Sequence, residues 1–222
     1  MAKQARAPEQ KEQRRAAILK AAEDLLRGSA YDQLTMADIA RQADLAKGTV
    51  YLYFPSKDDL FLQLLGDRQS DSLQQLGSAL NNLVPPADMA DRCRVLAKIL
   101  AAGMADDPLL VGLAKLAINT LEAGAEYDSI VAYKTALFDA MTGPAGKLAQ
   151  IMGGQSDDDG VRMLTVLYAL MLGFSELADT PETIMDATRD AGRPDLVDYK
   201  QAGLSDAFAT VLRGFAAEFA GQ

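Results

Sequence analysis

This 222-residue chain contains no histidine, and its only cysteine is Cys93. A zinc site built from His and Cys, a Ser–His pair and a Cys–His pair are therefore excluded. An all-carboxylate Mg²⁺ or Ca²⁺ site stays possible, although the run Asp157-Asp158-Asp159 lacks the alternating spacing of a calcium loop and more simply caps a helix. We expect no metal, no cofactor and no enzymatic activity; an all-helical enzyme is the weaker alternative.

The residues best suited to contact another molecule lie in a short helix expected over residues 46–53. Its outward side holds Lys47, Gly48, Thr49 and Leu52. Its inward side holds Val50, Tyr51 and, just after it, Phe54, which can pack on Ile18, Leu25 and Ile39. An exposed Lys-Gly-Thr edge is hard to explain as core, and glycine permits close approach. A helix with such an edge fits the major groove of DNA, about 12 Å wide.

Two preceding helices would position this segment. The first is expected over residues 9–27, where apolar residues recur along one side. The second should begin after the N-cap Thr35, because Asp38 three residues later completes a capping box, and it should end near residue 42. Residues 43–45 would form a tight turn before the third helix, which Pro55 ends. Three short helices joined in this way have the proportions of a helix-turn-helix unit.

The remaining sequence also predicts helices, so the expected fold is all-α. Their expected spans are 56–83, 87–104, 108–123, 126–149, 158–178, 181–190 and 204–219. The longest uncharged apolar stretch has 13 residues, fewer than the roughly 20 that cross a bilayer, and residues 1–15 do not resemble a secretory signal. We therefore expect no membrane span, and a cytoplasmic location.

The segment from Leu34 to Phe61, LTMADIARQADLAKGTVYLYFPSKDDLF, resembles the DNA-binding segment of TetR-family transcriptional repressors. The resemblance is specific over residues 12–61, and the body matches only in helix number and length. It implies that Lys47, Thr49 and Tyr51 reach bases or nearby backbone, with Gly48 at the closest approach. It also implies that Thr35, Tyr53 and Lys57 hold phosphates; Tyr51 as core and Lys57 as a solvated lysine are the alternatives.

Two residues depart from the family pattern. Asp44 stands in the turn where the family usually has Gly, and Asp adopts left-handed geometry less readily than Gly but better than most residues. Ala46 stands where the family usually has Ser or Thr, which removes a cap for the recognition helix. Neither change threatens the expected fold.

A DNA-binding domain with one short recognition helix reads too few bases, so it needs a partner. Two such domains on a two-fold axis read a palindrome. We expect a homodimer through a four-helix bundle of the last two long helices, as the family also implies. The expected interface residues are Leu164, Leu167, Tyr168, Met171, Phe208, Val211, Leu212 and Phe215. The alternative is that the apolar residues of these two helices pack only against the core of their own protomer.

The middle helices should enclose a pocket for a small-molecule effector. The expected pocket residues are Met104, Asn119, Glu122, Tyr127, Phe138 and Met141. Met and aromatic residues at helical spacing are also common in cores, and Glu122 could equally be a solvated or salt-bridged helix residue.

Charge is unevenly distributed along the chain, whose net charge is −9. Residues 1–60 hold ten Lys and Arg against nine Asp and Glu, so the acidic excess lies in the rest. We expect a DNA-binding domain over residues 1–60 and an effector-binding and dimerisation domain over 61–222. The predicted function is a repressor released from a palindromic operator by a small molecule; an activator, a ligand-independent regulator and a purely structural helical protein are the alternatives.

Overall fold

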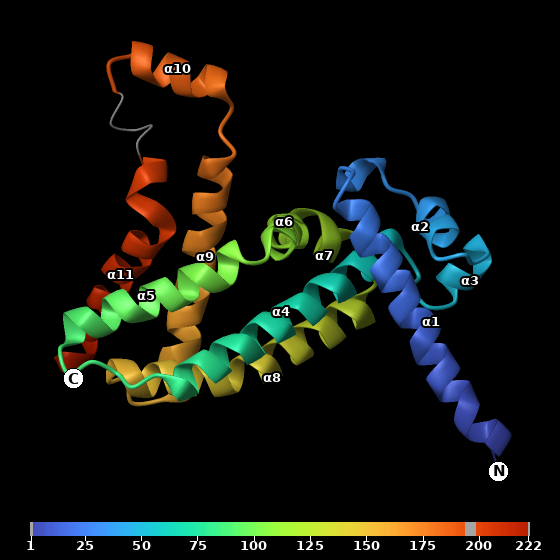
Figure 1. The fold of residues 1–222 in the computed structure, drawn as a ribbon, viewed down its shortest axis with the longest axis horizontal. Coiled ribbons are helices and arrows are strands. Elements are labelled where there is room, and N and C mark those ends of the chain that lie inside the picture. Colours follow the sequence, from blue (N-terminus) through green and yellow to red (C-terminus); the bar gives the residue numbers. More distant parts are fainter. Residues whose placement is uncertain (1, 194–198, 222) are drawn as a thin grey trace. The chain divides into compact units, whose positions relative to one another are not determined.

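The computed structural model describes residues 2–193 and 199–221, with the side chains of 2–8, 104, 105 and 199–202 left out. Every regular element in these residues is helical (Figure 1). The elements are α1 (Ala2–Leu26), η1 (Tyr31–Gln33), α2 (Met36–Gln42), α3 (Lys47–Tyr51), α4 (Lys57–Asn82), α5 (Met89–Ala105), α6 (Pro108–Leu116), η2 (Ala117–Leu121), α7 (Glu122–Gly124), α8 (Tyr127–Met152), α9 (Asp157–Ala178), α10 (Glu182–Asp190) and α11 (Tyr199–Ala220). The all-α prediction is confirmed.

The chain forms two compact units. The first contains Met1–Arg68 and Gly112–Leu137, and the second contains Gln69–Val111 and Phe138–Gln222. Helices α4 and α8 each contribute to both units. The expected head of residues 1–60 therefore shares its compact unit with residues 112–137, a segment distant in sequence. The expected division at residue 60 between a DNA-binding domain and an effector-binding domain stays a prediction.

The first unit is built on α1, α2, α3 and the N-terminal half of α4. Helix α2 packs on α1 and on α3. The fully buried side chains include Ile18 of α1, Ile39 of α2, Val50 of α3 and Phe61 of α4. No single helix can bury its own apolar side, so the core that these four helices share holds α3 in place.

The second unit is built around α11, which packs on α5 and α9. Its core includes Leu96 of α5, Leu148 of α8, Met163 of α9, and Phe208 and Leu212 of α11. Gly160 allows the closest contact, because a Cβ on this residue would overlap the backbone carbonyl of Ala145 in α8. The start of α9 therefore rests directly on the backbone of α8.

Most expected helix ends agree with the structure within two or three residues. Helix α1 begins seven residues earlier than expected, and α3 is shorter than the expected 46–53. Residues expected as one helix over 108–123 are divided by η2, a π-helical turn at Ala117–Leu121. In α11, Gly203 has φ 71°, so the regular helix starts at the expected residue 204.

Among the described residues, α9 is the one helix long and apolar enough to cross a bilayer by length and composition. Core helices of soluble proteins pass the same test, so this observation alone is weak. Helix α9 packs on α11 and buries Met163, Leu164, Leu167 and Met171 within the second unit. We therefore interpret it as a packed helix of this unit.

Candidate nucleic-acid interface

Helices α2 and α3 are joined by a tight turn whose geometry is defined by two local features. Thr35 caps α2 by accepting a hydrogen bond from the backbone N–H of Asp38 at 3.2 Å, and the Asp38 carboxylate accepts one from the Thr35 N–H at 3.1 Å. The Thr35 hydroxyl also donates to the Asp38 carboxylate at 2.6 Å, and this bond, followed by the one from the Thr35 N–H, holds the pKa of Asp38 below its usual value. Asp44 in the turn has φ 54° and is the one non-glycine residue with positive φ among the described residues. The expected capping box and left-handed turn are both confirmed.

Helix α3 has one buried side and one exposed side. Val50 is fully buried, and Phe54 just after the helix is 4% exposed. Lys47 and Gly48 are exposed, Thr49 is half-buried and Leu52 is 82% exposed. A Cβ on Gly48 would meet no atom within 4 Å, so this part of the helix is open. Ala46 provides no side-chain cap.

Tyr51 does not pack inward as the sequence suggested. Its side chain is 44% exposed, and its ring centroid lies 5.7 Å from the Lys47 ammonium nitrogen. The inward expectation was wrong because Val50 alone occupies the buried line of this five-residue helix. Tyr51 instead joins Lys47 on the exposed side, which agrees with the role that the family resemblance implied. Tyr53 is half-buried and Thr35 is exposed.

Lys57 has an internal role that the sequence did not reveal. Its ammonium donates hydrogen bonds to the backbone carbonyls of Tyr31 at 3.0 Å and Leu34 at 3.1 Å. It also lies 3.9 Å from the centroid of the Tyr31 ring. These contacts tie the start of α4 to η1, and they occupy two of the three N–H groups of this lysine. The structure therefore revises the expected phosphate contact of Lys57 toward a structural role.

A second internal network joins the start of α4 to residues 124–129. The Tyr31 hydroxyl donates to the Asp58 carboxylate, and a Cβ on Gly124 would overlap that carboxylate. Burial and then the neighbouring Asp58 raise the pKa of Tyr31 well above its usual value. Asp59, which is 4% exposed, accepts hydrogen bonds from Ser56 and from the backbone N–H of Glu126. Sequence analysis did not predict the contact with Glu126, which joins residues 67 apart.

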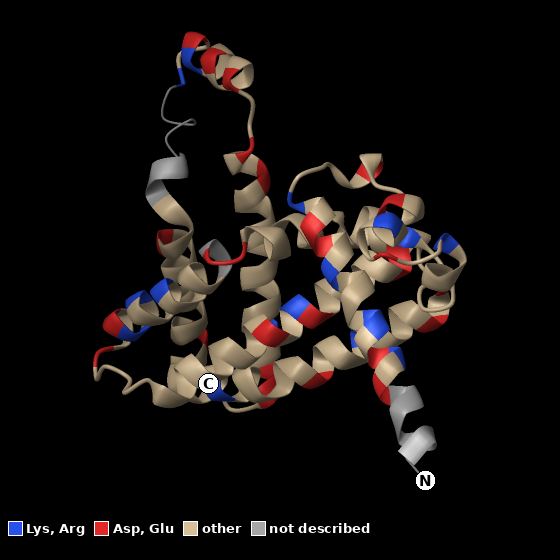
Figure 2. Ribbon diagram, turned by 45° about the vertical axis from the view of Figure 1, so that its right-hand side comes forward, with Lys and Arg blue, Asp and Glu red and all other residues tan. Residues whose placement is uncertain are grey.

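Several acidic side chains of the first unit are paired with bases. Asp38 pairs with Arg41 at 2.5 Å, Asp24 pairs with Lys20 at 2.7 Å, and Glu23 pairs with both Arg27 and Arg68 at 2.8 Å. Figure 2 shows the Lys and Arg residues of α1 to α3 interspersed with these acids. In the part of the chain that the structure describes, three exposed cations of this unit enter no ion pair: Lys11, Arg14 and Lys47.

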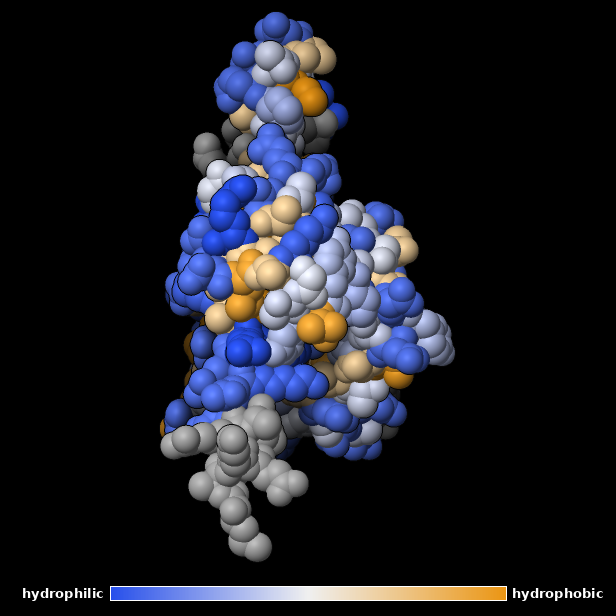
Figure 3. Space-filling model, turned by 90° about the vertical axis from the view of Figure 1, so that its right-hand side faces the viewer, coloured by the Kyte–Doolittle hydropathy of each residue, from blue (hydrophilic) through white to orange (hydrophobic). Residues whose placement is uncertain are grey.

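The surface view that faces the α1–α3 side is largely hydrophilic. Figure 3 shows its hydrophobic groups as small separate areas between blue and pale ones. The exposed Leu52 and the partly exposed Tyr51 belong to the large hydrophobic side chains that remain accessible. Isolated apolar groups on a polar surface suit a wet, charged interface better than an extended protein–protein interface.

The expected effector residues divide between the two units, with Asn119, Glu122 and Tyr127 in the first and Met104, Phe138 and Met141 in the second. Asn119, Tyr127 and Phe138 are exposed, and Met141 is half-buried. Glu122 accepts a hydrogen bond from Lys134 at 2.6 Å, so the salt-bridged alternative holds for this residue. The side chain of Met104 lies outside the described residues. The effector pocket stays a prediction.

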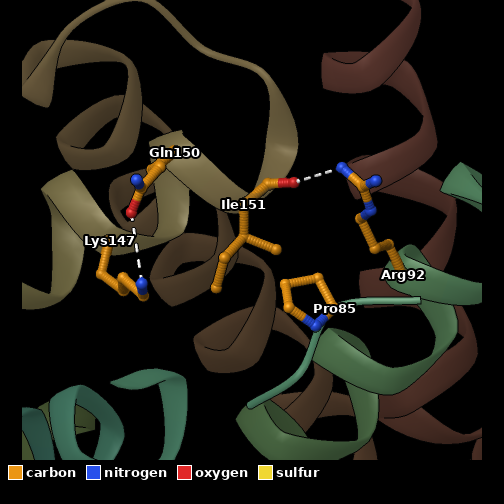
Figure 4. Close-up of a pocket in the computed structure, with 5 residues that line it drawn as sticks. All are labelled: Pro85, Arg92, Lys147, Gln150 and Ile151. Atoms are coloured by element: carbon orange, nitrogen blue, oxygen red, sulfur yellow. Dashed lines mark hydrogen bonds between the residues drawn. The ribbon is translucent and has the colours of Figure 1, made fainter. Parts of the chain in front are cut away.

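A different hollow of about 380 Å³ lies in the second unit and is lined by Pro85, Arg92, Lys147, Gln150 and Ile151 (Figure 4). Arg92 donates to the carbonyls of Pro86 at 2.7 Å and Ile151 at 3.0 Å. Lys147 donates to the side-chain oxygen of Gln150 at 3.2 Å, on the far side of Ile151 from Arg92. Arg92 therefore links the segment before α5 to the end of α8, and the two cations do not converge on one point.

The expected dimer residues mostly face their own core. Six of the eight are at most 9% exposed: Leu164, Leu167, Met171, Phe208, Leu212 and Phe215. Tyr168 and Val211 are half-buried. These side chains leave little surface for a partner to cover. Helical periodicity in the sequence indicates that a stripe of residues is buried, but not whether a partner or the protomer itself buries it. The dimer interface itself stays a prediction, and the outward faces of α9 and α11 are exposed in this structure.

Two short helices joined by a tight turn, with an open edge on the second, define a helix-turn-helix protein. Residues 18–64 match the bacterial regulatory proteins of the tetR family, and residues 70–218 match the tetracyclin repressor-like C-terminal domain. The chain belongs to the TetR family of transcriptional regulators. The C-terminal match includes α9, which supports its assignment as a helix of this domain.

Three similar proteins place the chain within this family. It is 32% identical over 98 residues to the HTH-type transcriptional repressor KstR of Rhodococcus jostii, a match covering 44% of each chain. It is 32% identical over 59 residues to the fatty acid metabolism regulator protein of Bacillus subtilis, 27% of this chain and 30% of that protein. The chain therefore matches less than half the length of these relatives. The FadR repressor of Thermus thermophilus, solved with lauroyl-CoA, has the same fold at 18% identity, with TM-score 0.58 over 90% of this chain and 92% of that one.

Proposed function

We propose that this regulator is a repressor that binds a palindromic DNA operator as a homodimer and leaves it when a small apolar effector binds. The single observation that carries this proposal is the open edge of α3 around Gly48, opposite the buried Val50. An edge without side-chain bulk lets a helix backbone come close to base edges in the major groove. The cytoplasm is the proposed location, as is general for this family.

The proposed contacts with DNA divide into two groups. Lys47, Gly48, Thr49, Tyr51 and Leu52 would face the bases or nearby backbone from α3. Thr35, Tyr53 and the unpaired cations Lys11 and Arg14 would contact phosphates, where positive charge displaces condensed counterions. The exposed N-terminus of α2 favours a phosphate at Thr35 as well, because its free N–H groups carry partial positive charge.

The homodimer would form through the outward faces of α9 and α11. On α9, Thr165, Val166, Ala169, Gly173 and Leu177 are exposed at helical spacing. On α11, Thr210, Gly214 and Ala217 are exposed in the same manner. Small residues allow two helices to approach closely, and four such helices from two protomers would make a bundle.

Ala169→Glu tests this interface because the residue is exposed and its replacement should leave the protomer folded. We expect the variant to be monomeric in sedimentation experiments at concentrations where the wild type is dimeric. Ala136→Glu makes the same chemical change at an exposed position of α8 and should leave the dimer intact. A dimeric Ala169→Glu protein would reject this face.

The effector would be an apolar or amphipathic molecule. In the first unit, Ile118 of η2, Tyr127 and Val131 are 67%, 76% and 45% exposed, and the last two lie one turn apart on α8. Burying each such side chain contributes roughly 1.5–3 kcal/mol, which favours a ligand that covers them. A π-helical turn such as η2 often marks a functional position. The lauroyl-CoA complex of the Thermus FadR makes that thioester the first molecule to test.

The experiment selects bound duplexes from a random pool with the purified protein and then titrates lauroyl-CoA into the complex. We expect a palindromic consensus, and dissociation of the DNA as the acyl-CoA concentration rises. Tyr127→Ala should need more acyl-CoA for the same release, whereas Val84→Ala, an exposed apolar residue outside this unit, should behave as wild type. Asymmetric selected sequences would contradict the dimeric mode, and unchanged DNA binding would exclude this acyl-CoA as the effector.

A further inference from the structure

We infer that Leu52 reads the C5-methyl group of a thymine in each half of the operator. The inference rests on the proposed function, because it assumes that α3 enters the major groove. Leu52 is 82% exposed on a small helical head, although covering a leucine from water is favourable. The exposed Leu52 side chain is therefore free to contact another molecule, and its surroundings indicate which one.

Helical geometry places Leu52 directly beyond Gly48. An α-helix turns about 100° per residue, so residues four apart lie within about 40° of each other. Leu52 follows α3 with φ −73° and ψ −18°, which continues the helical turn. Gly48 and Leu52 thus share the line opposite the buried Val50. Because helical side chains lean toward the N-terminus, the Leu52 side chain extends over the open space at Gly48.

The chemical composition of α3 limits what it can read by hydrogen bonds. Residues 46–53 contain no Arg, Asn or Gln, the side chains that best pair with guanine or adenine besides Lys. Lys47 is the one charged residue among them. An apolar side chain in the major groove finds one apolar group on the base pairs, the methyl group of thymine. Leu52 therefore supplies a contact that distinguishes T·A from the other pairs.

The test uses the duplex selected by the wild-type protein, with each thymine replaced in turn by deoxyuridine in both half-sites. Deoxyuridine keeps every hydrogen-bonding group and lacks only the methyl group. We expect one thymine position at which the replacement weakens wild-type binding about fourfold per half-site, the factor for burying one methyl group. At that position Leu52→Ala should bind the thymine and uracil duplexes equally. Replacing the T·A pair by C·G should weaken wild-type binding, and 5-methylcytosine should restore part of it.

Val84→Ala is the matched control, because it removes an exposed apolar side chain that lies outside α3 and outside the proposed effector and dimer surfaces. It should discriminate thymine from uracil as the wild type does. The inference is overturned if no thymine is sensitive to loss of its methyl group, if the selected half-site lacks thymine, or if Leu52→Ala keeps the discrimination. Absence of salt-sensitive binding to any duplex would instead reject the proposed function itself, so the two failures are distinguishable.

Discussion

The side chain of Asp59 accepts a hydrogen bond from the backbone N–H of Glu126, with 3.0 Å between Oδ1 and N. Asp59 also caps its own helix α4 through Ser56, whose hydroxyl lies 2.6 Å from Oδ2. One buried carboxylate thus accepts a hydrogen bond from the hydroxyl that caps α4 and another from the N–H group just before α8, which would otherwise lack a partner. The head and residues 112–137 share one compact unit partly for this reason.

This relationship predicts a dependence of stability on pH. Burial alone would raise the pKa of Asp59, but hydrogen bonds from Ser56, Ser129 and the backbone N–H of Glu126 outweigh it and lower the pKa. A lowered folded-state pKa contributes stability above the unfolded-state value, about 3.9, that is lost as pH falls through the folded-state value. Asp59→Asn should therefore cost about 1–3 kcal/mol at pH 7 and progressively less below about pH 4. Urea denaturation between pH 3 and 7 measures the difference, and Asp139→Asn serves as an exposed control. Parallel pH curves for wild type and Asp59→Asn would contradict this role.

Substitutions of Asp44, in the turn before α3, should separate the effect of backbone strain on stability from the effect of its charge on DNA binding. Asp44 has φ 54°, where glycine is favoured, so Asp44→Gly should raise the unfolding free energy by about 0.5 kcal/mol. Asn tolerates the same geometry, so Asp44→Asn should leave stability unchanged. Both variants remove a negative charge beside the proposed groove and should bind DNA more tightly at low salt. Equal DNA affinity of wild type and both variants would place Asp44 away from the phosphates.

Gly48→Ala should have opposite effects on the stability of the fold and on DNA affinity. Its Cβ would meet nothing in the free protein, so Gly48→Ala should gain up to about 1 kcal/mol from helix propensity. The added methyl group would stand between α3 and the bases, and we expect about tenfold weaker binding, ~1.4 kcal/mol. Gly112→Ala is the control, because this exposed helical glycine is equally open. A Gly48→Ala protein that binds DNA as tightly as wild type would show that α3 approaches through another side.

Two lysines of the first unit, Lys47 and Lys57, should respond differently to substitution. Lys47→Ala should reduce the slope of log K against log salt by about 0.9 for each phosphate contact that is lost. Lys57→Ala should lower the melting temperature, because two backbone carbonyls lose their donor, and should keep the salt slope of its folded fraction. Thermal denaturation and anisotropy titrations measure both quantities. A reduced slope in folded Lys57→Ala would restore the phosphate role that the sequence suggested.

The close contact between α9 and α8 predicts a large effect on stability in the second unit. Gly160→Ala should destabilise the protein by about 3 kcal/mol, because a Cβ would overlap the backbone oxygen of Ala145 and force the helices apart. Gly103→Ala, in an open position of α5, should be neutral or slightly stabilising. Equal melting temperatures for the two variants would mean that α9 can shift without cost.

The sequence predicted the elements whose signals are local. The capping box at Thr35 marked the start of α2, and the position of Asp44 marked the turn. These features depend on residues within four positions of each other, which is why sequence alone sufficed.

Features that depend on distant partners could not be predicted. The carbonyls that hold Lys57 and the N–H that meets Asp59 come from elements far along the chain. Apolar spacing identified Leu167 and Phe208 as buried residues but could not say whether a partner or the protomer buries them. The π-helical turn η2 has the same residue pattern as an α-helix, so nothing in its sequence distinguishes it.

An anisotropy titration of the selected duplex with purified protein, repeated at several salt concentrations, tests the central claim that α3 enters DNA. We predict binding of two protomers per duplex, with log K falling linearly as log salt rises and a shallower slope for Lys47→Ala. Binding that is absent at all salt concentrations, or that does not change with salt, would contradict the account.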